Sequence, residues 1–316
     1  MEKSEEVSES EWEVLPPEIK VRFLAEVYLD YQQIRVAANN KLMHYQRKYG
    51  KEAVLQELGW FTDVANMMED RIVRELTELL EEFPIYTEWL KYVKGVGPAL
   101  AGQIIGLLYT EDGRGIERFS NVSKLWKYCA LDVVDGRAPR PEKGRHYGRK
   151  KKLKGVLWKI AVQMLKAGRL AEKRGKPIPK GYQYYLEFKR KEEAKNKPFR
   201  LPVDEAAGKE LAEDIGSIRA GTLIKKRGTR TVGRTSVTIT RLKRELRKVG
   251  RPEDDMILVR LAPSHIHNRA LRKLMKLFLA LLWEKWRTLE GLPVRPPYAK
   301  AILGHDDLLS PEDLID

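Results

Sequence analysis

The sequence predicts a mainly α-helical protein, in which an N-terminal antiparallel helical hairpin precedes a basic helical domain. Apolar residues recur at spacings of three and four along most of the chain, a Gly-x-Gly-Pro turn separates two apolar helical stretches, and β-branched alternation is confined to one short segment. We therefore expect an acidic flexible tail at 1–16, the helical hairpin at 17–83, and a helix-hairpin-helix domain at 84–316 with a small β-hairpin insertion at about 222–240.

The composition is that of a folded and strongly basic protein. The formal net charge is +15, while 42% of the residues are hydrophobic, which is enough for a core. A positive field of this size attracts phosphate backbones but does not determine the fold. No apolar run approaches the ~20 residues of a spanning helix, and the acidic first residues do not resemble a secretory signal, so we expect no membrane partner.

The cysteine content indicates a reducing compartment. Cys129 is the single cysteine, which excludes an internal disulfide framework and a cysteine-based zinc finger. A cytoplasmic protein is therefore expected. The charged fraction of 33% is also typical of thermophilic proteins.

The first helix is predicted to begin at Pro16-Pro17 and to end at Gly50. Its apolar seam consists of Leu24, Val27, Tyr31, Ile34, Ala38, Leu42 and Tyr45. A second seam consists of Leu55, Leu58, Met68, Ile72, Leu76, Leu79 and Phe83. The two helices can close on each other or pair with a second copy as a homodimer through residues 17–83. We favour closure within one chain, because one chain supplies both seams, and keep the homodimer as the alternative.

The turn Lys94-Gly95-Val96-Gly97-Pro98 predicts a helix-hairpin-helix. The two glycines allow positive φ, and Pro98 suits the first position of the following helix. The free amides of Gly95, Gly97 and Ala99 would then point outward at a positive helix N-terminus, where a phosphate oxygen binds well. The alternative is a tight turn in which the glycines serve geometry alone.

A basic segment follows the helix-hairpin-helix. Its cations are Arg137, Arg140, Lys143, Arg145, Arg149, Lys150, Lys151, Lys152 and Lys154, and Glu142 is the one acid among them. The segment opens a helix with the core face Leu153, Val156, Leu157, Ile160, Met164 and Leu165. Cations held at the start of a packed helix favour a groove for a phosphate backbone, whereas a solvated charged surface is the alternative.

The segment 222–240 predicts a β-hairpin with a basic tip. Leu223-Ile224 and residues 236–240 are β-branched or alternating, and Gly228 and Gly233 lie between them. The tip residues Arg227, Arg230 and Arg234 are candidates for contact with nucleic acid. An exposed insertion whose charges keep its edges soluble is the competing interpretation.

Two further helical stretches complete the chain. Tyr182, Tyr184, Tyr185 and Phe188 have the spacing of core residues, although stacking on bases is a known use of such side chains. A long helix is predicted from Ser264 to about Glu290, where Gly291 ends it. Opposite its apolar face runs a basic stripe of Arg269, Arg272, Lys273 and Lys276.

Candidate catalytic residues are not evident. His265 and His267 are two residues apart, so they cannot chelate one ion as an i, i+4 pair does, and hydrogen-bonding roles are favoured. The acids of 253–255 follow Pro252 in a predicted turn, and the chain has no Walker loop, nucleophile elbow or dinucleotide fingerprint. We therefore expect no catalytic site, no metal and no cofactor.

The order of several motifs resembles the C-terminal domain of the large transposase family of insertion sequence 110 type. That family's pattern runs roughly G-x-G-P, then R-F, then L-x-x-Y-x-G-L; here the counterparts are 94–98, Arg118-Phe119 and Leu125 to Leu131. The similarity covers about residues 85–165 and, more loosely, the last long helix. The hairpin at 17–83 also lies where such transposases carry a coiled coil.

The resemblance implies a helical scaffold for nucleic acid but not the family's chemistry. The family's RuvC-like domain with four metal-binding acids has no counterpart in this chain. The family also has a catalytic serine in the loop after L-x-x-Y-x-G-L, whereas residues 132–137 contain no serine and Ala130 replaces the glycine.

The expected function is therefore that of a transposase-related nucleic-acid-binding protein, with DNA favoured over RNA. It would act as a non-catalytic accessory factor of a mobile element. Two alternatives stay open. One is a recombinase or nuclease whose active site is unrecognised or supplied by a partner, and the other is a scaffold for structured RNA.

Overall fold

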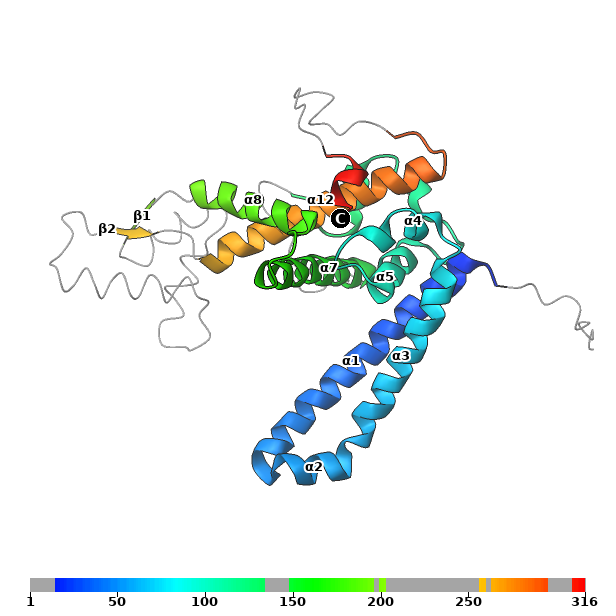
Figure 1. Cartoon of the computed structure of the whole chain (residues 1–316), viewed down its shortest axis with the longest axis vertical. Helices are drawn as coiled ribbons and strands as arrows, with labels where there is room; N and C mark the ends of the chain where they lie inside the picture. Colours follow the sequence, from blue (N-terminus) through cyan, green and yellow to red (C-terminus); the bar gives the residue numbers. More distant parts are fainter. Residues whose placement is uncertain are drawn as a thin grey trace, which may run out of the picture. The chain divides into compact units, whose positions relative to one another are not determined.

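The structure is a computed structural model that is mainly helical, and it describes residues 15–133, 148–195, 199–202, 256–259, 263–294 and 309–315 (Figure 1). The acidic tail, most of the basic segment, and the predicted β-hairpin at 222–240 lie outside these residues. The chain divides into two compact units, Met1–Ser120 with Trp283–Asp307, and Asn121–Leu282 with Leu308–Asp316.

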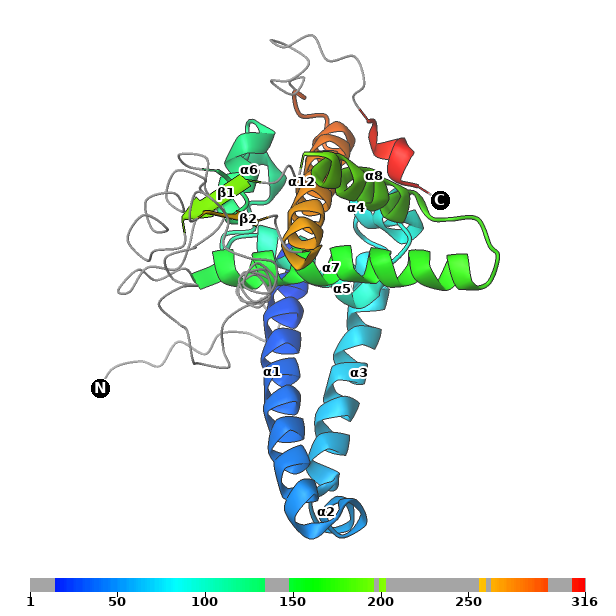
Figure 2. The same cartoon turned by 90° about the vertical axis from the view of Figure 1, so that its left-hand side faces the viewer.

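The first unit contains the helical hairpin. Helix α1 (Pro17–Tyr49) begins with Pro17 at its first position and ends at Gly50, whose φ of 94° stops the helix, both as predicted. Helix α2 (Lys51–Leu58) forms the bend, and α3 (Trp60–Leu80) returns beside α1 (Figures 1 and 2). An ion pair between Arg35 Nε and Glu69 Oε1, 2.5 Å apart, joins the two long helices.

The predicted seam of α1 is buried only in part. Of the seven predicted seam residues only Leu42 is buried, and the other buried residues of α1, which are Val21, Arg22, Ala25 and Leu29, were not in the predicted seam. The expectation was wrong for Ile34 and Tyr45, whose side chains are 48% and 46% exposed. Within the described part of the chain, only α2 joins α1 and α3 at the outer end of the hairpin, and these helices leave part of both seams exposed there.

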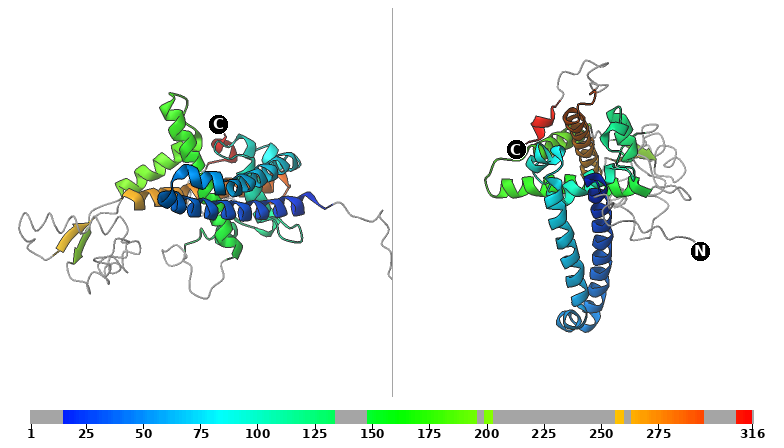
Figure 3. Two further views of the ribbon diagram at one scale, coloured as in Figure 1. Left: turned by 90° about the horizontal axis from the view of Figure 1, so that it is seen from below. Right: turned by 90° about the vertical axis from the view of Figure 1, so that its right-hand side faces the viewer.

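The exposed apolar residues of the hairpin form a set that we call the tip patch. Its members are Ile34, Val36, Met43, Tyr45, Tyr49, Leu55, Leu58, Trp60, Phe61, Val64 and Met67. They come from the outer half of α1, from α2 and from the start of α3, the end of the hairpin seen in both panels of Figure 3.

The base of the hairpin holds the core of the first unit. Helix α5 (Pro98–Leu108) packs against both α1 and α3, and all its residues from Ala101 to Leu108 are buried. A Cβ added at Gly106 would lie 2.5 Å from the carbonyl oxygen of Val21, so only glycine permits α1 to approach α5 this closely.

Short helices complete this unit. Helix α4 (Pro84–Thr87) and the 3₁₀ helix η2 (Leu90–Tyr92) lead into α5, and the 3₁₀ helix η3 (Ile116–Arg118) follows it. The last turns of α12 (Pro263–Leu289) also belong here. The Trp283 indole donates to the Phe119 carbonyl at 2.7 Å, and Arg287 donates to the same oxygen at 3.2 Å.

The second unit consists of α6 (Val122–Tyr128), α7 (Gly148–Lys173), α8 (Lys180–Ala194), the part of α12 up to Leu282, and the 3₁₀ helix η4 (Pro311–Leu314). Strand β1 (Phe199–Pro202) pairs antiparallel with β2 (Met256–Val259). Tyr182 and Tyr185 of α8 are buried and stack with ring centroids 6.0 Å apart, as expected for core residues, whereas Tyr184 and Phe188, also expected in the core, are only half-buried. The predicted last helix is also confirmed, since α12 ends two residues before Gly291, whose φ is 65°.

Candidate nucleic-acid interface

The turn between η2 and α5 corrects the expected role of its glycines. Gly95 has a φ of 95°, a conformation that favours glycine, as predicted. Gly97 instead has φ −93° and ψ 174°, which is extended backbone open to any residue, so the expectation of positive φ at both glycines was wrong. Pro98 lies at the first position of α5, where its missing N–H costs no hydrogen bond.

Three backbone amides of the turn have no hydrogen-bond partner among the residues that the structure describes. Within the described ranges, the N–H groups of Gly95, Gly97 and Ala99 donate to no other residue, although the Gly97 carbonyl accepts from the amides of Leu100 and Ala101 at 3.0 and 2.9 Å. Gly97 is exposed, and no atom lies within 4 Å of a Cβ added there. The turn therefore offers accessible backbone donors at the positive end of an α-helix.

The turn is held by apolar side chains and presents one unpaired cation. Val93 and Val96 are buried beneath it. Lys91 is paired with Glu81 at 2.8 Å, whereas Lys94 is exposed and forms no ion pair within the described ranges. An anion at the amides would thus meet the backbone dipoles and Lys94.

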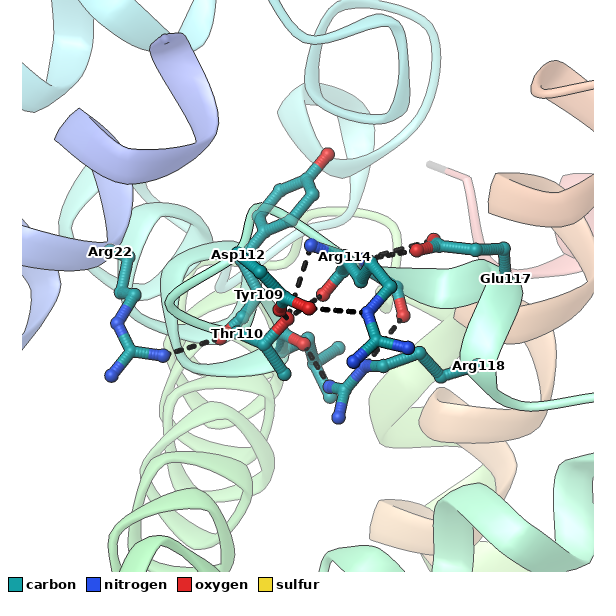
Figure 4. Close-up of polar contacts among 9 residues, drawn as sticks. Arg22, Tyr109, Thr110, Asp112, Arg114, Glu117 and Arg118 are labelled. Atoms are coloured by element: carbon teal, nitrogen blue, oxygen red, sulfur yellow. Dashed lines mark hydrogen bonds and ion pairs between the residues drawn. The ribbon is translucent and has the colours of Figure 1, made fainter. Parts of the chain in front are cut away.

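The opposite end of α5 is fixed by two arginines. Figure 4 shows Arg22 donating to the Tyr109 carbonyl, at 3.0 Å, and Arg118 donating to the Leu108 carbonyl. Guanidinium groups at these positions donate hydrogen bonds to carbonyl groups at the helix end that have no partner within the helix. Their positive charge also complements the negative end of the helix dipole. The guanidinium of Arg118 also lies 4.8 Å from the Phe119 ring centroid. Of the pair that the resemblance singles out, Arg118 thus contacts α5, and its guanidinium lies over the ring of Phe119.

The acids in the loop after α5 are engaged locally. Asp112 accepts from Thr110 and from Arg114, and the Glu117 carboxylate accepts from the Gly115 amide at 2.8 Å (Figure 4). The hydrogen bond from Thr110, followed by that from Arg114, holds the pKa of Asp112 below its ordinary value. Among the described residues, no group of three or more His, Cys, Asp or Glu side chains is arranged to bind a metal ion.

The predicted basic residues fall into three groups. Arg137, Arg140, Lys143, Arg145, Arg227, Arg230 and Arg234 lie outside the described residues. Arg149, Lys150 and Lys151 lie in the first turns of α7 by their backbone. Lys152 and Lys154 are half-buried on the same helix.

Lys154 belongs to a cluster of cations that we call the α7–α12 cluster, made of Lys154, Arg272 and Lys276. The Arg272 guanidinium donates to the Asp132 carbonyl at 2.6 Å. Lys276 Nζ lies 3.9 Å from the centroid of the Trp126 ring, and the Trp126 indole donates to the Lys276 carbonyl at 3.1 Å. Both α12 cations are therefore positioned by the segment from α6 to Asp132.

Burial and charge repulsion lower the pKa values of the cations in this cluster. Burial, and then the charge of Arg272, lowers the pKa of Lys154 and of Lys276, while the Asp132 carboxylate acts in the opposite direction. Burial likewise lowers the pKa of Arg272. Three cations thus share one nearby acid in a partly desolvated place.

The other half of the predicted basic stripe is neutralised. Lys273 Nζ lies 2.5 Å and Arg269 3.4 Å from the Glu192 carboxylate of α8. Burial raises the pKa of Glu192, but the hydrogen bond from Lys273 and the two positive charges outweigh it, so the pKa lies below its ordinary value. Of the four cations of the stripe, Arg269 and Lys273 therefore pair with a carboxylate. Arg272 and Lys276 form no ion pair within the described residues.

Arg272, Lys276 and Trp126 were not among the predicted site residues. The stripe itself was visible in the sequence at i, i+3, i+4 and i+7. Lys273 pairs with Glu192, whereas Arg272 donates to the Asp132 carbonyl. These contacts join residues far apart in the chain, so periodicity does not reveal them.

His267, near the start of α12, has a structural partner, and both His265 and His267 have lowered pKa values. The Tyr185 hydroxyl lies 2.7 Å from Nδ1 of His267. Burial, and then the charges of Arg169 and Lys189, lowers the pKa of His267. Burial, followed by the charge of Arg269, lowers the pKa of His265. Cys129 is buried, and burial raises the pKa of its thiol, which makes the thiolate rare.

Comparison with known proteins finds no matching family model, no matching curated protein and no matching solved structure. None of the helices in the described ranges is long and apolar enough to cross a membrane.

Proposed function

We propose that the chain is a nucleic-acid-binding protein, with DNA favoured over RNA, that serves as a non-catalytic accessory factor of a mobile element. The observation that carries the proposal is the turn at 94–99. Its three unpaired amides lie at the N-terminus of a helix of 11 residues that is otherwise buried. Backbone donors of this kind bind phosphate oxygens without reading sequence.

The charge of the molecule supports a polyanion as the partner. The net charge of +15 provides a long-range attraction that depends on salt. In the second unit, the three cations of the α7–α12 cluster share one nearby carboxylate, that of Asp132, whereas lysines and arginines on an exposed helix surface commonly pair with neighbouring acids.

A relation to transposases of insertion sequence 110 type is part of the same proposal. Ala130 has a φ of 55°, a conformation that favours glycine, and it is the position at which that family's pattern carries glycine. It ends α6 with the Leu131 amide donating to the Trp126 carbonyl at 2.8 Å. A helix ending that favours glycine, at the position where the family's pattern has glycine, supports the resemblance at the level of local structure.

An electrophoretic shift assay tests the proposal. Full-length protein is mixed with duplex DNA, branched DNA and structured RNA of equal length, with and without Mg²⁺. We expect retardation of DNA with no cleavage. Cleavage that disappears on substitution of one acid or serine would favour the recombinase or nuclease, preference for structured RNA would favour the RNA scaffold, and the absence of any shift would reject the proposal.

We also propose that residues 17–83 form a homodimer. The support is the tip patch, whose aromatic members Tyr45, Tyr49, Trp60 and Phe61 are 44–61% exposed. Covering these apolar side chains with a protein partner would remove them from water, which favours association. A second copy is the occupant we favour, because Ile34 and Tyr45 of the α1 seam remain exposed beside α3 and the same seam on a second copy matches them in period.

A further inference from the structure

The α7–α12 cluster has the composition and position of an anion site. Lys154 comes from the second turn of α7, and Arg272 and Lys276 come from successive turns of α12. All three are half-buried, and within the described residues none of them forms an ion pair with a carboxylate. We propose that Lys154, Arg272 and Lys276 together bind a phosphate group.

The side chains of Arg272 and Lys276 are each held in place by a neighbouring residue. The Arg272 guanidinium is tied to the Asp132 carbonyl, which uses one of its five donors, and Lys276 rests on the face of Trp126. Fixing these long side chains removes rotamer freedom that binding would otherwise have to restrict. A guanidinium with remaining donors and two ammonium groups match the oxygens of a phosphate.

The arrangement is unfavourable in the absence of an anion. Like charges at short range in a partly desolvated place repel, and a single carboxylate, Asp132, opposes three cations. For Arg269 and Lys273 of the same helix the charge repulsion is offset, because the Glu192 carboxylate pairs with both. A bound phosphate would supply the missing negative charge.

The ligand that fits the proposed function is a backbone phosphate of nucleic acid, and this assignment rests on that function. Free inorganic phosphate presents the same oxygens, so the two sources must be distinguished by experiment. Trp126 does not offer a stacking face on the side that Lys276 covers, which favours phosphate contact over base contact at this place.

The test compares two double variants that remove equal charge from one helix. Arg272→Gln with Lys276→Gln removes the cluster's α12 cations, and Arg269→Gln with Lys273→Gln is the matched control. Thermal melting of the full chain is recorded in inorganic phosphate and in chloride of equal ionic strength. We expect phosphate to raise the melting temperature of the parent and of the control by several degrees, and the cluster variant to show no such rise.

The same variants are then titrated with a 20-base-pair duplex at increasing salt. The cluster variant should bind more weakly, with the slope of log K against log[salt] reduced by about 0.9 for each phosphate that it no longer neutralises, while the control keeps the parent slope. A parent that responds to phosphate but not to the duplex would reject the proposed function and leave a site for free phosphate. Equal phosphate response and equal slopes in both double variants would overturn the inference.

Lys154→Gln separates a binding role from a structural one. Relief of charge repulsion should leave its melting temperature in chloride unchanged or higher, while the phosphate-induced rise and the duplex affinity fall. A lower melting temperature with an intact response to phosphate would instead assign Lys154 to the fold and contradict the inference.

Discussion

Gly95 and Gly97 are separated by one residue, yet they contribute to the turn in different ways. Gly95 supplies a backbone conformation that other residues adopt only with strain. Gly97 has ordinary backbone angles and open space around it, so its small size matters to what approaches from outside. The difference gives two substitutions with opposite expectations.

We expect Gly95→Ala to lower the free energy of unfolding by about 1–2 kcal/mol, the cost of placing a Cβ at positive φ. Gly97→Val should change stability by less than about 1 kcal/mol, an N-cap effect, and weaken binding to duplex DNA because its side chain covers the amides. Chemical denaturation and fluorescence anisotropy measure the two effects. If Gly97→Val binds as tightly as the parent, the turn does not contact the phosphates.

Ala130 carries a strain that glycine would remove. Its φ of 55° is unfavourable for a side chain, so we expect Ala130→Gly to raise the free energy of unfolding by about 0.5–1 kcal/mol after the greater freedom of the unfolded glycine is subtracted. Ala167→Gly, in the middle of α7, is the control and should lower it by about 0.5–1 kcal/mol. A decrease in stability at Ala130 as well would show that its methyl group is needed for packing.

The hairpin formed by α1, α2 and α3 is stabilised at its base and exposed at its end. Helix α5 is buried against the base, so deletion of the hairpin would also uncover α5. Single substitutions in the tip patch are therefore the cleaner test of the proposed homodimer.

We expect Trp60→Lys to convert a dimer into a monomer, since a charge in an apolar interface is costly. Trp158→Lys is the control, because Trp158 of α7 is also exposed, at 51% against 61% for Trp60, and lies outside the tip patch. Sedimentation velocity at micromolar concentration gives the masses. A parent that sediments as a monomer, or a Trp60→Lys protein that stays dimeric, would refute the dimer.

The contact between helices α8 and α12 at His267 should make the stability of the protein depend on pH. The pKa of His267 lies below its ordinary value of 6.5, so on acidification the unfolded chain binds the proton before the folded one. The stability contributed by neutral His267 is therefore complete above about pH 6.5 and declines as the pH falls through that value.

His267→Asn should reduce this dependence. Asparagine preserves a partner for the Tyr185 hydroxyl but does not titrate, so the fall in melting temperature between about pH 7.5 and 5.5 should be smaller than in the parent. His265, whose pKa is also lowered, contributes to the dependence that remains. An equally steep fall in the variant would mean that His267 does not contribute.

At the level of the whole molecule, local patterns predicted the helical elements well. The helix starts and stops at Pro17, Gly50 and Gly291 are properties of single residues and are read directly. The apolar period likewise placed α12 and the buried tyrosines of α8.

Features that depend on distant residues could not be predicted in this way. Periodicity marks Ile34 and Tyr45 as apolar positions but does not say whether another helix covers them. Periodicity also does not reveal that the Glu192 carboxylate pairs with Lys273, whereas Lys276 lies in the cluster with Lys154 and Arg272. Burial and charge compensation are set by the tertiary fold, and for the same reason the candidate site was predicted only in part.

Binding of the full chain to a labelled 20-base-pair duplex, followed by anisotropy over a series of salt concentrations, tests nucleic-acid binding most directly. Because phosphate contacts release counterions, log K should fall linearly with log[salt], with a slope of about −0.9 for each phosphate neutralised. The turn and the α7–α12 cluster together predict a slope at least as steep as about −2. No binding at the lowest salt, or an affinity that salt does not change, would contradict the proposed function.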